Sequence, residues 1–473
     1  MRLSSPLSPL GLFLAALAGG ACAHASGDPG RAPHAIAAPA PPAWLDELAR
    51  RYDGEYRALG LETRMFSPEQ WWRVATPLLA RDRGFTVAEA GRSAEGRPLR
   101  HVAWGEGATR VLLWSQMHGD ESTASMALAD LFRFLGEHPT HPLVERLRRE
   151  ATLHFLPVMN PDGAARFQRR NAQGIDINRD ARALASPEAR ALKSLRDRVR
   201  PAFGFNLHDQ RVGYRAGDSE RGVAIALLAP PYDASGGVNP VRARAIEVAA
   251  VMRTALEPYI AGRIARWDDS FNPRAFGDLM TQWGTSTVLV ESGGIEGDPQ
   301  KQVLRKLNFL ALAAALDAIA SGSHAGTPQA LYAGLPENGE VWPDLLIEGG
   351  VLAAPGVAEA RVDLLVKFEH PLLGHGGEIA DVGDLAGARA RRVIDASGLF
   401  IVPIAGPGAA GAGASGSPPA PPPIGPGEPA RFHLSRDPQG RDIVWTLAED
   451  LDPAHRYPAT VGERAGETLP PGF

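Results

Sequence analysis

The chain has 473 residues, 44% of them hydrophobic, and a formal net charge of -5. This length and composition are sufficient for a substantial buried core and indicate two to four folded units, which excludes a chain that is disordered throughout. The slightly acidic balance excludes the broad basic surface that binds nucleic acid without sequence preference, so no nucleic-acid partner is expected.

Residues 1–25 have the pattern of an export signal peptide. Arg2 provides a positive start, the run 9–18 is apolar, and small residues follow. The apolar run is too short to span a bilayer stably. We therefore expect an exported protein that is periplasmic or secreted.

Two processing routes remain open for this segment. Residues 23–25 fit a signal-peptidase site of the A-x-A type, whereas residues 19–22 resemble a bacterial lipoprotein box without its usual aliphatic residue. The second route would make the protein an outer-membrane lipoprotein, anchored through a lipid on Cys22. Because Cys22 is the only cysteine, the mature chain has no intramolecular disulfide.

The first folded domain, residues 44–322, follows a flexible spacer, residues 26–43, that is rich in Ala and Pro. Within this domain, short apolar or β-branched runs alternate with segments of helical periodicity. The runs expected to be strands are 110–114, 152–158, 203–207 and 287–290, and the segments expected to be helices are 122–135, 186–199 and 240–256. This alternation is typical of an α/β sheet covered by helices on both faces.

Residues 323–405 lack long helical periodicity and are expected to form a smaller β-rich accessory domain. Its predicted strands are 344–347, 360–368 and 392–394. Residues 406–431 form a Gly/Ala/Pro linker whose composition cannot bury a core. Residues 432–473 are expected to be a loosely ordered C-terminal tail with one plausible strand at 442–447.

A His-x-x-Glu pair, His118 and Glu121, directly follows the predicted strand 110–114. The spacing alone is weak evidence for a metal site, because His375 and Glu378 repeat it in the β-rich region. The first pair lies between a predicted strand and a predicted helix, at the edge of the sheet where open α/β folds bind ligands. The second pair has no helix after it, and we interpret it as a loop pair that does not bind metal.

Other predicted strands of the first domain also end in polar residues. His208 and Asp209 follow one strand, Glu291 follows another, and residues 160–163 (Asn-Pro-Asp-Gly) follow a third. Two histidines and one carboxylate form the ligand set of a catalytic zinc, whose open position holds a water with a lowered pKa. A nearby carboxylate such as Glu291 could take the proton of that water.

Five segments in a fixed order resemble the zinc carboxypeptidases of the carboxypeptidase A type, over roughly residues 65–320. They are 117–121 (MHGDE), 160–163 (NPDG), 169–179 (RRNAQGIDINR), 207–208 (LH) and 289–294 (LVESGG). The resemblance implies a catalytic domain with a mixed sheet and one zinc ion per chain, held by His118, Glu121 and His208. It also implies that Glu291 is the general base that passes a proton to the leaving amine.

The same resemblance assigns residues that bind substrate. Arg169 matches the arginine that stabilises the oxyanion, with Arg170 as the alternative if the register shifts by one. Asn178 and Arg179 match the pair that binds the terminal carboxylate of the substrate, and an arginine can hold a carboxylate through two parallel hydrogen bonds. Residues 175–177 (Ile-Asp-Ile) alternate as in a strand.

Two departures from the family pattern concern the substrate. Residues 267–283 contain no tyrosine where classical members carry a mobile one, and Asp209 stands where many relatives have serine. The pocket for the leaving residue is expected in this segment. Phe276 would favour an apolar side chain and Asp278 a basic one or the amine of diaminopimelate, and the sequence leaves both open.

A second resemblance, to the small β-sandwich of amidohydrolases, covers parts of the β-rich region. Its segments are 344–350, 379–384 and 392–400. The His-x-His metal motif of those enzymes does not follow, so no second active site is expected there.

The leading hypothesis is an exported zinc metallocarboxypeptidase that acts on peptides with a free C-terminal carboxylate. Three alternatives stay open: a peptidase for the stem peptides of peptidoglycan, a zinc deacylase of N-acyl amino acids, and an inactive peptide-binding relative. Contact with a membrane is expected only through a lipid anchor at Cys22.

Overall fold

The computed structural model describes residues 40–354, 358–372, 374–404 and 423–448. The predicted signal peptide, most of the spacer and most of the Gly/Ala/Pro linker lie outside these residues. Within the described ranges, no helix is long and apolar enough to cross a membrane.

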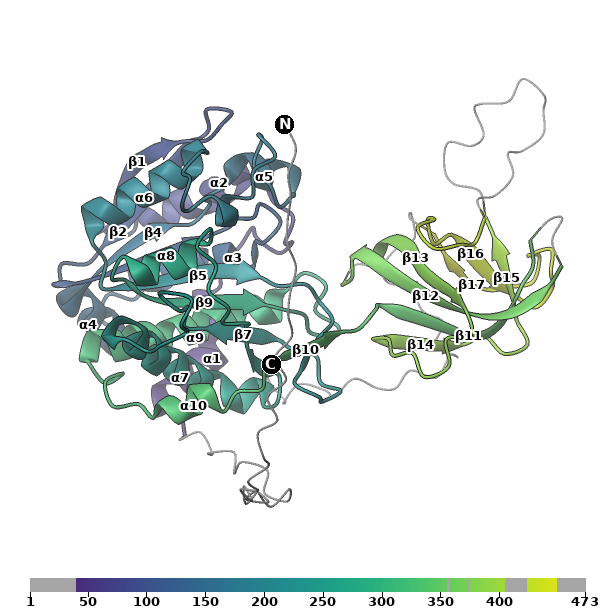
Figure 1. The fold of residues 1–473 in the computed structure, drawn as a ribbon. Coiled ribbons are helices and arrows are strands. Elements are labelled where there is room, and N and C mark those ends of the chain that lie inside the picture. The colour runs from purple at the N-terminus through teal and green to yellow at the C-terminus, as the bar shows by residue number, and fades with distance from the viewer. Residues whose placement is uncertain (1–39, 355–357, 373, 405–422, 449–473) are drawn as a thin grey trace, which may run out of the picture. The chain divides into compact units, whose positions relative to one another are not determined.

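An eight-stranded mixed sheet forms the centre of the first domain (Figure 1). In sheet order its strands are β1 (Thr86–Arg92), β2 (Pro98–Trp104), β4 (Ala151–Leu156), β3 (Thr109–Ser115), β5 (Phe203–Asp209), β9 (Ser286–Ser292), β7 (Ile225–Leu228) and β8 (Ile264–Arg266). The four central strands, β4, β3, β5 and β9, are parallel to one another. Their carboxyl ends therefore meet at one edge of the sheet.

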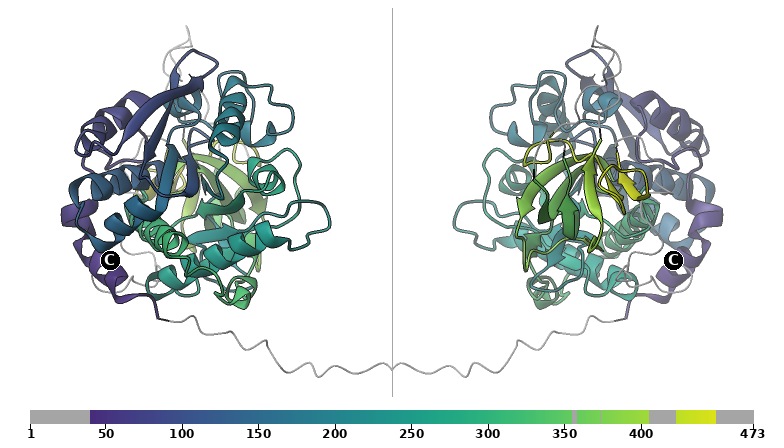
Figure 2. Two further views of the ribbon diagram at one scale, coloured as in Figure 1. Left: turned by 90° about the vertical axis from the view of Figure 1, so that its left-hand side faces the viewer. Right: turned by 90° about the vertical axis from the view of Figure 1, so that its right-hand side faces the viewer.

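Helices cover both faces of this sheet, as Figures 1 and 2 show. One face carries α1 (Ala43–Arg51), η1 (Tyr52–Tyr56), α2 (Pro68–Leu79), α3 (Thr123–Glu137), α4 (Pro142–Glu150), α7 (Pro240–Ile260), α9 (Gln302–Ser321) and α10 (Gln329–Ala333), and the other carries α6 (Pro187–Val199) and α8 (Phe276–Gln282). Strand β3 contributes to both cores: Val111 and Leu113 pack into the larger one, Leu112 and Trp114 into the smaller. Alternate residues of a strand point to opposite faces, so a strand buried on both sides is apolar throughout. The predicted fold class is confirmed.

Local signals fix where several helices begin. Ser67 precedes α2, and its side chain accepts a hydrogen bond from the backbone N–H of Gln70, while the Gln70 side chain caps the N–H of Ser67. Ser186 before α6 and Asn239 before α7 also cap a backbone N–H, and a proline follows each of them.

The C-terminal part of the described chain forms a second, seven-stranded sheet with a core of its own. Its strands are β11 (Leu345–Leu352), β12 (Ala360–His370), β13 (His375–Gly383), β14 (Arg392–Asp395), β15 (Phe400–Pro403), β16 (Phe432–Ser435) and β17 (Ile443–Leu447). The expected β-rich region is therefore present.

Both predicted ends of this region differ from the structure. Leu331 and Tyr332 of α10 pack into the larger core of the first domain, and β10 (Asn338–Val341) pairs with β6 (Tyr214–Ala216), so the first domain continues past residue 322. At the other end, β16 pairs with β15 and β17 pairs with β16. Residues 432–447 are therefore part of the second sheet and not a tail, because alternate side chains of these strands are buried in its core.

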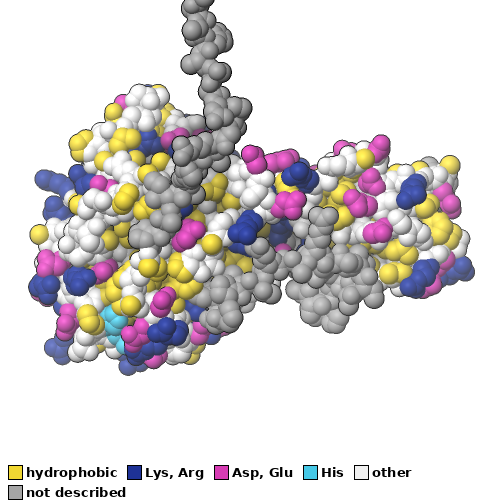
Figure 3. Space-filling model, turned by 90° about the horizontal axis from the view of Figure 1, so that it is seen from below, with side chains coloured by type: hydrophobic (Ala, Val, Ile, Leu, Met, Phe, Trp, Pro, Cys, Tyr) yellow, Lys and Arg dark blue, Asp and Glu magenta, His cyan; other side chains and the backbone are white. Residues whose placement is uncertain are grey.

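Charged side chains of both signs are interspersed on the face drawn in Figure 3. This distribution agrees with the small net charge of the chain.

A buried ion pair joins α3 to α9 in the larger core. The side chains of Asp130 and Arg305 are both 0% exposed, and the guanidinium donates to both carboxylate oxygens, at 2.5 and 2.8 Å. Asp130 also accepts hydrogen bonds from the Tyr52 hydroxyl and the Ala58 backbone N–H. Every donor around this carboxylate would lose its partner if the carboxylate were removed.

We expect Asp130→Ala to lower the free energy of unfolding by about 3–5 kcal/mol, because it leaves the Arg305 charge buried without a counter-charge. Urea denaturation followed by tryptophan fluorescence measures this loss. Arg149→Ala is the control, since it removes an exposed ion pair with Glu150 and should cost less than about 1 kcal/mol. Equal losses in the two variants would contradict the structural role of the buried pair.

Candidate metal centre

Three side chains from two parts of the sequence meet at the carboxyl edge of the central strands. His118, Glu121 and His208 are buried, and one potential ligand atom of each lies within 4.8 Å of the others. The Glu121 carboxylate lies between the imidazoles, with Oε1 2.7 Å from His118 Nδ1 and Oε2 2.6 Å from His208 Nδ1. Among the residues that the structure describes, this is the only such group of three potential ligands.

The loop between β3 and α3 is shaped by close backbone contacts. Gln116, at the end of β3, has a positive φ of 52°, which is uncommon for a residue with a side chain. A Cβ atom at Gly119 would collide with the backbone of Gly163 and Ala164. The glycine between the two ligands is therefore required for this loop to pack against α5 (Pro161–Arg166).

Asp176, which lies inside the segment 169–179, is a further polar residue of this site that no motif assigns a role. Its Oδ1 is 3.0 Å from His118 Nε2, and its Oδ2 accepts hydrogen bonds from Arg169 Nε and Nη2 at 3.1 and 2.8 Å. A carboxylate at Nε2 holds the proton there and leaves the Nδ1 lone pair free to bind a cation. Its position between His118 and Arg169 could be found only from the folded chain.

The charges of the cluster fit a bound cation. Burial disfavours the ionised form of Glu121, but the two imidazoles hold its pKa well below the usual range. Burial also works against a charged His118, yet Glu121 and Asp176 raise its pKa to about 9, whereas burial lowers the pKa of His208. The carboxylate therefore requires a positive charge at the imidazole nitrogens, which a divalent metal would supply.

Glu291 lies beside His208 on the neighbouring strand. The two residues are partners in the parallel register of β5 and β9, and Glu291 is 7% exposed. Its Oε2 is buried and has no hydrogen-bond partner among the described residues. Burial and the charges of Glu121 and Asp209 raise its pKa well above the ordinary value, which is typical of an acid–base residue.

Asp209, which follows His208, has a structural role that accounts for the departure from serine. Its Oδ2 accepts hydrogen bonds from Lys301 Nζ at 2.9 Å and from the Thr123 hydroxyl at 2.7 Å, and all three side chains are buried. The Lys301 ammonium also donates to the Ser292 carbonyl. No local pattern predicts the contact of Lys301, because this residue lies 92 positions from Asp209 in the sequence.

The structure separates the two candidate arginines. Arg169 Nη1 is 3.1 Å from His118 Nδ1 and 3.4 Å from Glu121 Oε1. Arg170 is exposed, and its Nη1 donates to the Gly174 carbonyl. Only Arg169 is therefore placed at the cluster.

Asn178 and Arg179 lie on a short 3-10 helix, η2 (Ile177–Arg179), and the strand expected at residues 175–177 is wrong. The Asp176 side chain caps the N–H of Asn178, which competes with an extended conformation. Asn178 Nδ2 is 3.4 Å from His208 Nε2, and its Oδ1 accepts a hydrogen bond from the Phe276 N–H. Arg179 is partly exposed and donates to the Asn178 carbonyl.

Of the two residues considered for the pocket of the leaving residue, Phe276 is 0% exposed and packs in the smaller core. Its side chain is therefore not available to a substrate in this structure. Burial raises the pKa of Asp278 to about 6, against the opposing charges of Arg179 and Arg242. Its Oδ1 accepts a hydrogen bond from the Asn272 N–H.

The second His-x-x-Glu pair lies on strand β13, so the loop predicted there is wrong. Glu378 is exposed. Positions three apart on a strand belong to opposite faces of the sheet, which is unlike the turn that brings His118 and Glu121 together.

Comparisons with known proteins agree with this site. Residues 79–205 match the family model described as zinc carboxypeptidase. Carboxypeptidase 2 of Trichophyton tonsurans is 29% identical over 129 residues, which are 27% of this chain and 22% of that protein. Carboxypeptidase SOL1 of Arabidopsis thaliana is 25% identical over 156 residues, 27% of this chain and 31% of that protein. The chain thus spans less than a third of the length of each of these relatives.

A solved structure, a metallo-carboxypeptidase from Burkholderia cenocepacia, is 19% identical and superposes with a TM-score of 0.44 over 56% of this chain and 71% of that one. The matched segment 79–205 contains His118 and Glu121, and His208 follows it directly at the end of β5. Residues 79–205 are therefore similar to the zinc carboxypeptidase family, which agrees with the resemblance found in the sequence.

Proposed function

We propose that this protein is an exported zinc metallocarboxypeptidase that hydrolyses the C-terminal peptide bond of peptides. The observation that supports this most directly is Glu291, a buried carboxylate with an unpartnered oxygen beside the His118–Glu121–His208 cluster. Keeping a carboxylate buried without a partner costs stability, so its retention points to a chemical role.

His118, Glu121 and His208 would hold one zinc ion per chain. A bound zinc lowers the pKa of a water molecule and polarises a carbonyl oxygen. The two histidines and one carboxylate leave room for such a water in a four-coordinate site. Asp176 would fix the orientation of His118 through Nε2.

The protein's own side chains would carry the proton and the charge. Glu291 would take a proton from the attacking water and deliver it to the nitrogen of the leaving amine. The Arg169 guanidinium, anchored by Asp176, would stabilise the developing oxyanion. Asn178 and Arg179 would bind the terminal carboxylate and so place the last peptide bond at the site.

Export is proposed from the sequence of residues 1–25, which favours a periplasmic or secreted protein and leaves a lipid on Cys22 as a second route. Peptides with a free C-terminal carboxylate are the proposed substrates.

Glu291→Gln should retain zinc and lose about 10²–10⁴-fold in kcat, because the amide keeps the shape of the side chain but cannot accept the proton. Steady-state hydrolysis of a blocked dipeptide, with zinc content measured by atomic absorption, tests this. Glu378→Gln is the matched control on an exposed strand residue and should behave as the wild type. Full turnover by Glu291→Gln would rule out the proposed base.

Asp176→Asn should weaken zinc binding by about 10–100-fold, because the amide no longer holds the His118 tautomer or the Arg169 guanidinium. Competition with a chromogenic chelator measures the affinity. An unchanged zinc affinity would show that Asp176 does not position the ligand.

Conversion of the substrate's C-terminal carboxylate to an amide should abolish cleavage, because the amide carries no charge for Arg179 to bind. Arg179→Ala should raise KM for the free acid, because it removes the guanidinium that binds the carboxylate. Mass spectrometry of the products from a peptide library measures cleavage. Internal cleavage of amidated peptides would contradict exopeptidase action. Turnover of N-acyl amino acids without any peptide cleavage would identify a deacylase instead.

A further inference from the structure

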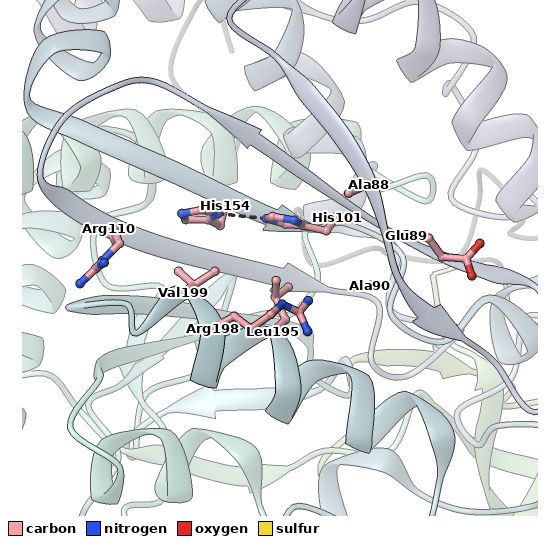
Figure 4. A pocket seen from close by; sticks show the side chains of 9 residues that line it. All are labelled: Ala88, Glu89, Ala90, His101, Arg110, His154, Leu195, Arg198 and Val199. Atoms are coloured by element: carbon pink, nitrogen blue, oxygen red, sulfur yellow. Dashed lines mark hydrogen bonds between the residues drawn. The ribbon is translucent and has the colours of Figure 1, made fainter.

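A hollow of about 550 Å³ lies on the face of the sheet that α6 covers, and Figure 4 shows the residues that line it. Strands β1, β2, β3 and β4 and the C-terminal turn of α6 contribute its lining. Arg110, at the start of β3, lines the hollow, whereas His118 follows the end of the same strand. The two sites are therefore at opposite ends of β3.

Two histidines form the floor of this hollow. His101 on β2 and His154 on β4 have ring centroids 5.2 Å apart and nearly parallel planes, 15° apart, and His101 Nε2 is 3.0 Å from His154 Nδ1. Figure 4 shows the two rings side by side. When both rings are neutral, one N–H is used within the pair, so in either tautomer the pair presents one N–H donor and one lone pair on its outer nitrogens.

Two arginines of the lining, both exposed and without a carboxylate partner among the described residues, flank the hollow. Arg110 makes no side-chain hydrogen bond or ion pair with another residue in the described parts of the chain, and Arg198 Nη1 donates only to the Ser194 hydroxyl, at 2.7 Å. Glu89 is the one acidic residue of the lining, and its carboxylate already accepts a hydrogen bond from Arg92. The hollow thus offers donors and positive charge to a ligand.

These charges also determine which kind of ligand fits. Burial lowers the pKa of His101 to about 4, assisted by the Arg198 charge, and burial lowers that of His154 to about 4, assisted by the charges of His101 and Arg110. The same guanidinium charges repel a metal cation. Among the described residues the histidine pair also lacks a third side chain placed as a ligand.

We propose that this hollow is a binding site for an oxoanion, with a phosphoryl group as the best match. Arg110 and Arg198 would donate to its oxygens, and the outer N–H of the histidine pair would donate a third hydrogen bond. A monohydrogen phosphate also carries an O–H that can donate to the remaining imidazole lone pair, which sulfate cannot do. This site is independent of the peptidase activity.

Binding of the anion is linked to proton uptake by the histidine pair. The ligand-free pair is neutral at pH 7 and at pH 5.5, because both pKa values are about 4. A bound anion favours the imidazolium form and raises these pKa values, so the complex holds more protons than the free protein as the pH falls. The affinity for an anion should therefore increase from pH 7 to pH 5.5. Arg110, Arg198 and Glu89 are the other ionisable residues of the lining.

Isothermal titration calorimetry of the full-length, zinc-loaded protein tests the proposal. Titrations with inorganic phosphate and with glycerol 3-phosphate at pH 7 compare the binding of a free ion with that of a phosphate ester. Titrations with sulfate at pH 7 and pH 5.5 measure the proton linkage of the protein, because the charge of sulfate does not change between these pH values. We expect saturable binding of phosphate, with the ester either bound similarly or excluded, and tighter binding of sulfate at pH 5.5.

Variants assign the binding to the hollow. Arg110→Gln and Arg198→Gln should each weaken phosphate binding about tenfold, since each removes a charge-assisted hydrogen bond. The double variant His101→Asn, His154→Asn should lose the pH dependence of sulfate binding. Arg149→Gln, an exposed arginine outside the lining, is the control and should leave binding unchanged.

Peptide hydrolysis should be unaffected in all these variants, which separates this test from the test of the proposed function. The proposal is overturned if no anion binds, if Arg110→Gln and Arg198→Gln bind phosphate as the control does, or if the histidines instead bind a second equivalent of zinc that is lost in the double variant.

Discussion

The parallel pairing of β5 with β3 on one side and β9 on the other is the constraint on which the metal centre depends. The register places Leu207 opposite Ser115 and His208 opposite Glu291, so the third proposed metal ligand and the proposed base lie side by side near the ends of neighbouring strands. Backbone hydrogen bonds over the whole length of three buried strands fix this alignment. A slip of one residue would turn His208 or Glu291 to the opposite face of the sheet.

A second constraint is the concentration of buried acids at this edge. Glu121, Asp176, Asp209 and Glu291 are all buried, and three of them have positive or polar partners: the histidines for Glu121, Arg169 for Asp176, and Lys301 for Asp209. Glu291 is the exception. Asp130 is likewise neutralised by Arg305, whereas no described residue donates a hydrogen bond to either carboxylate oxygen of Glu291, which agrees with the chemical role proposed for it.

The same sheet also carries two electrostatically different sites. At the carboxyl end of β3, clustered carboxylates and imidazoles favour a cation, whereas at its amino end Arg110, Arg198 and the His101–His154 pair favour an anion. The strand is apolar and buried between these ends, and its burial on both faces keeps the two sites rigidly apart. The two proposed binding sites would thus lie at opposite ends of one β-strand.

The sequence by itself determined the α/β class, the four central strands β4, β3, β5 and β9, the helices α3, α6 and α7, and the residues of the candidate metal cluster, because strand–loop–helix patterns and short motifs are local properties of the chain. The tertiary structure decided what depends on residues distant in sequence: the contact of Asp176 with His118, the pairing of Lys301 with Asp209, and the choice of Arg169 over Arg170. The tertiary structure also pairs residues 432–435 with β15, from which the linker separates them in sequence. It likewise brings His101 and His154 together, although they are 53 residues apart in sequence. Burial and sheet register are properties of the folded chain, so no pattern within a single segment could have predicted these contacts.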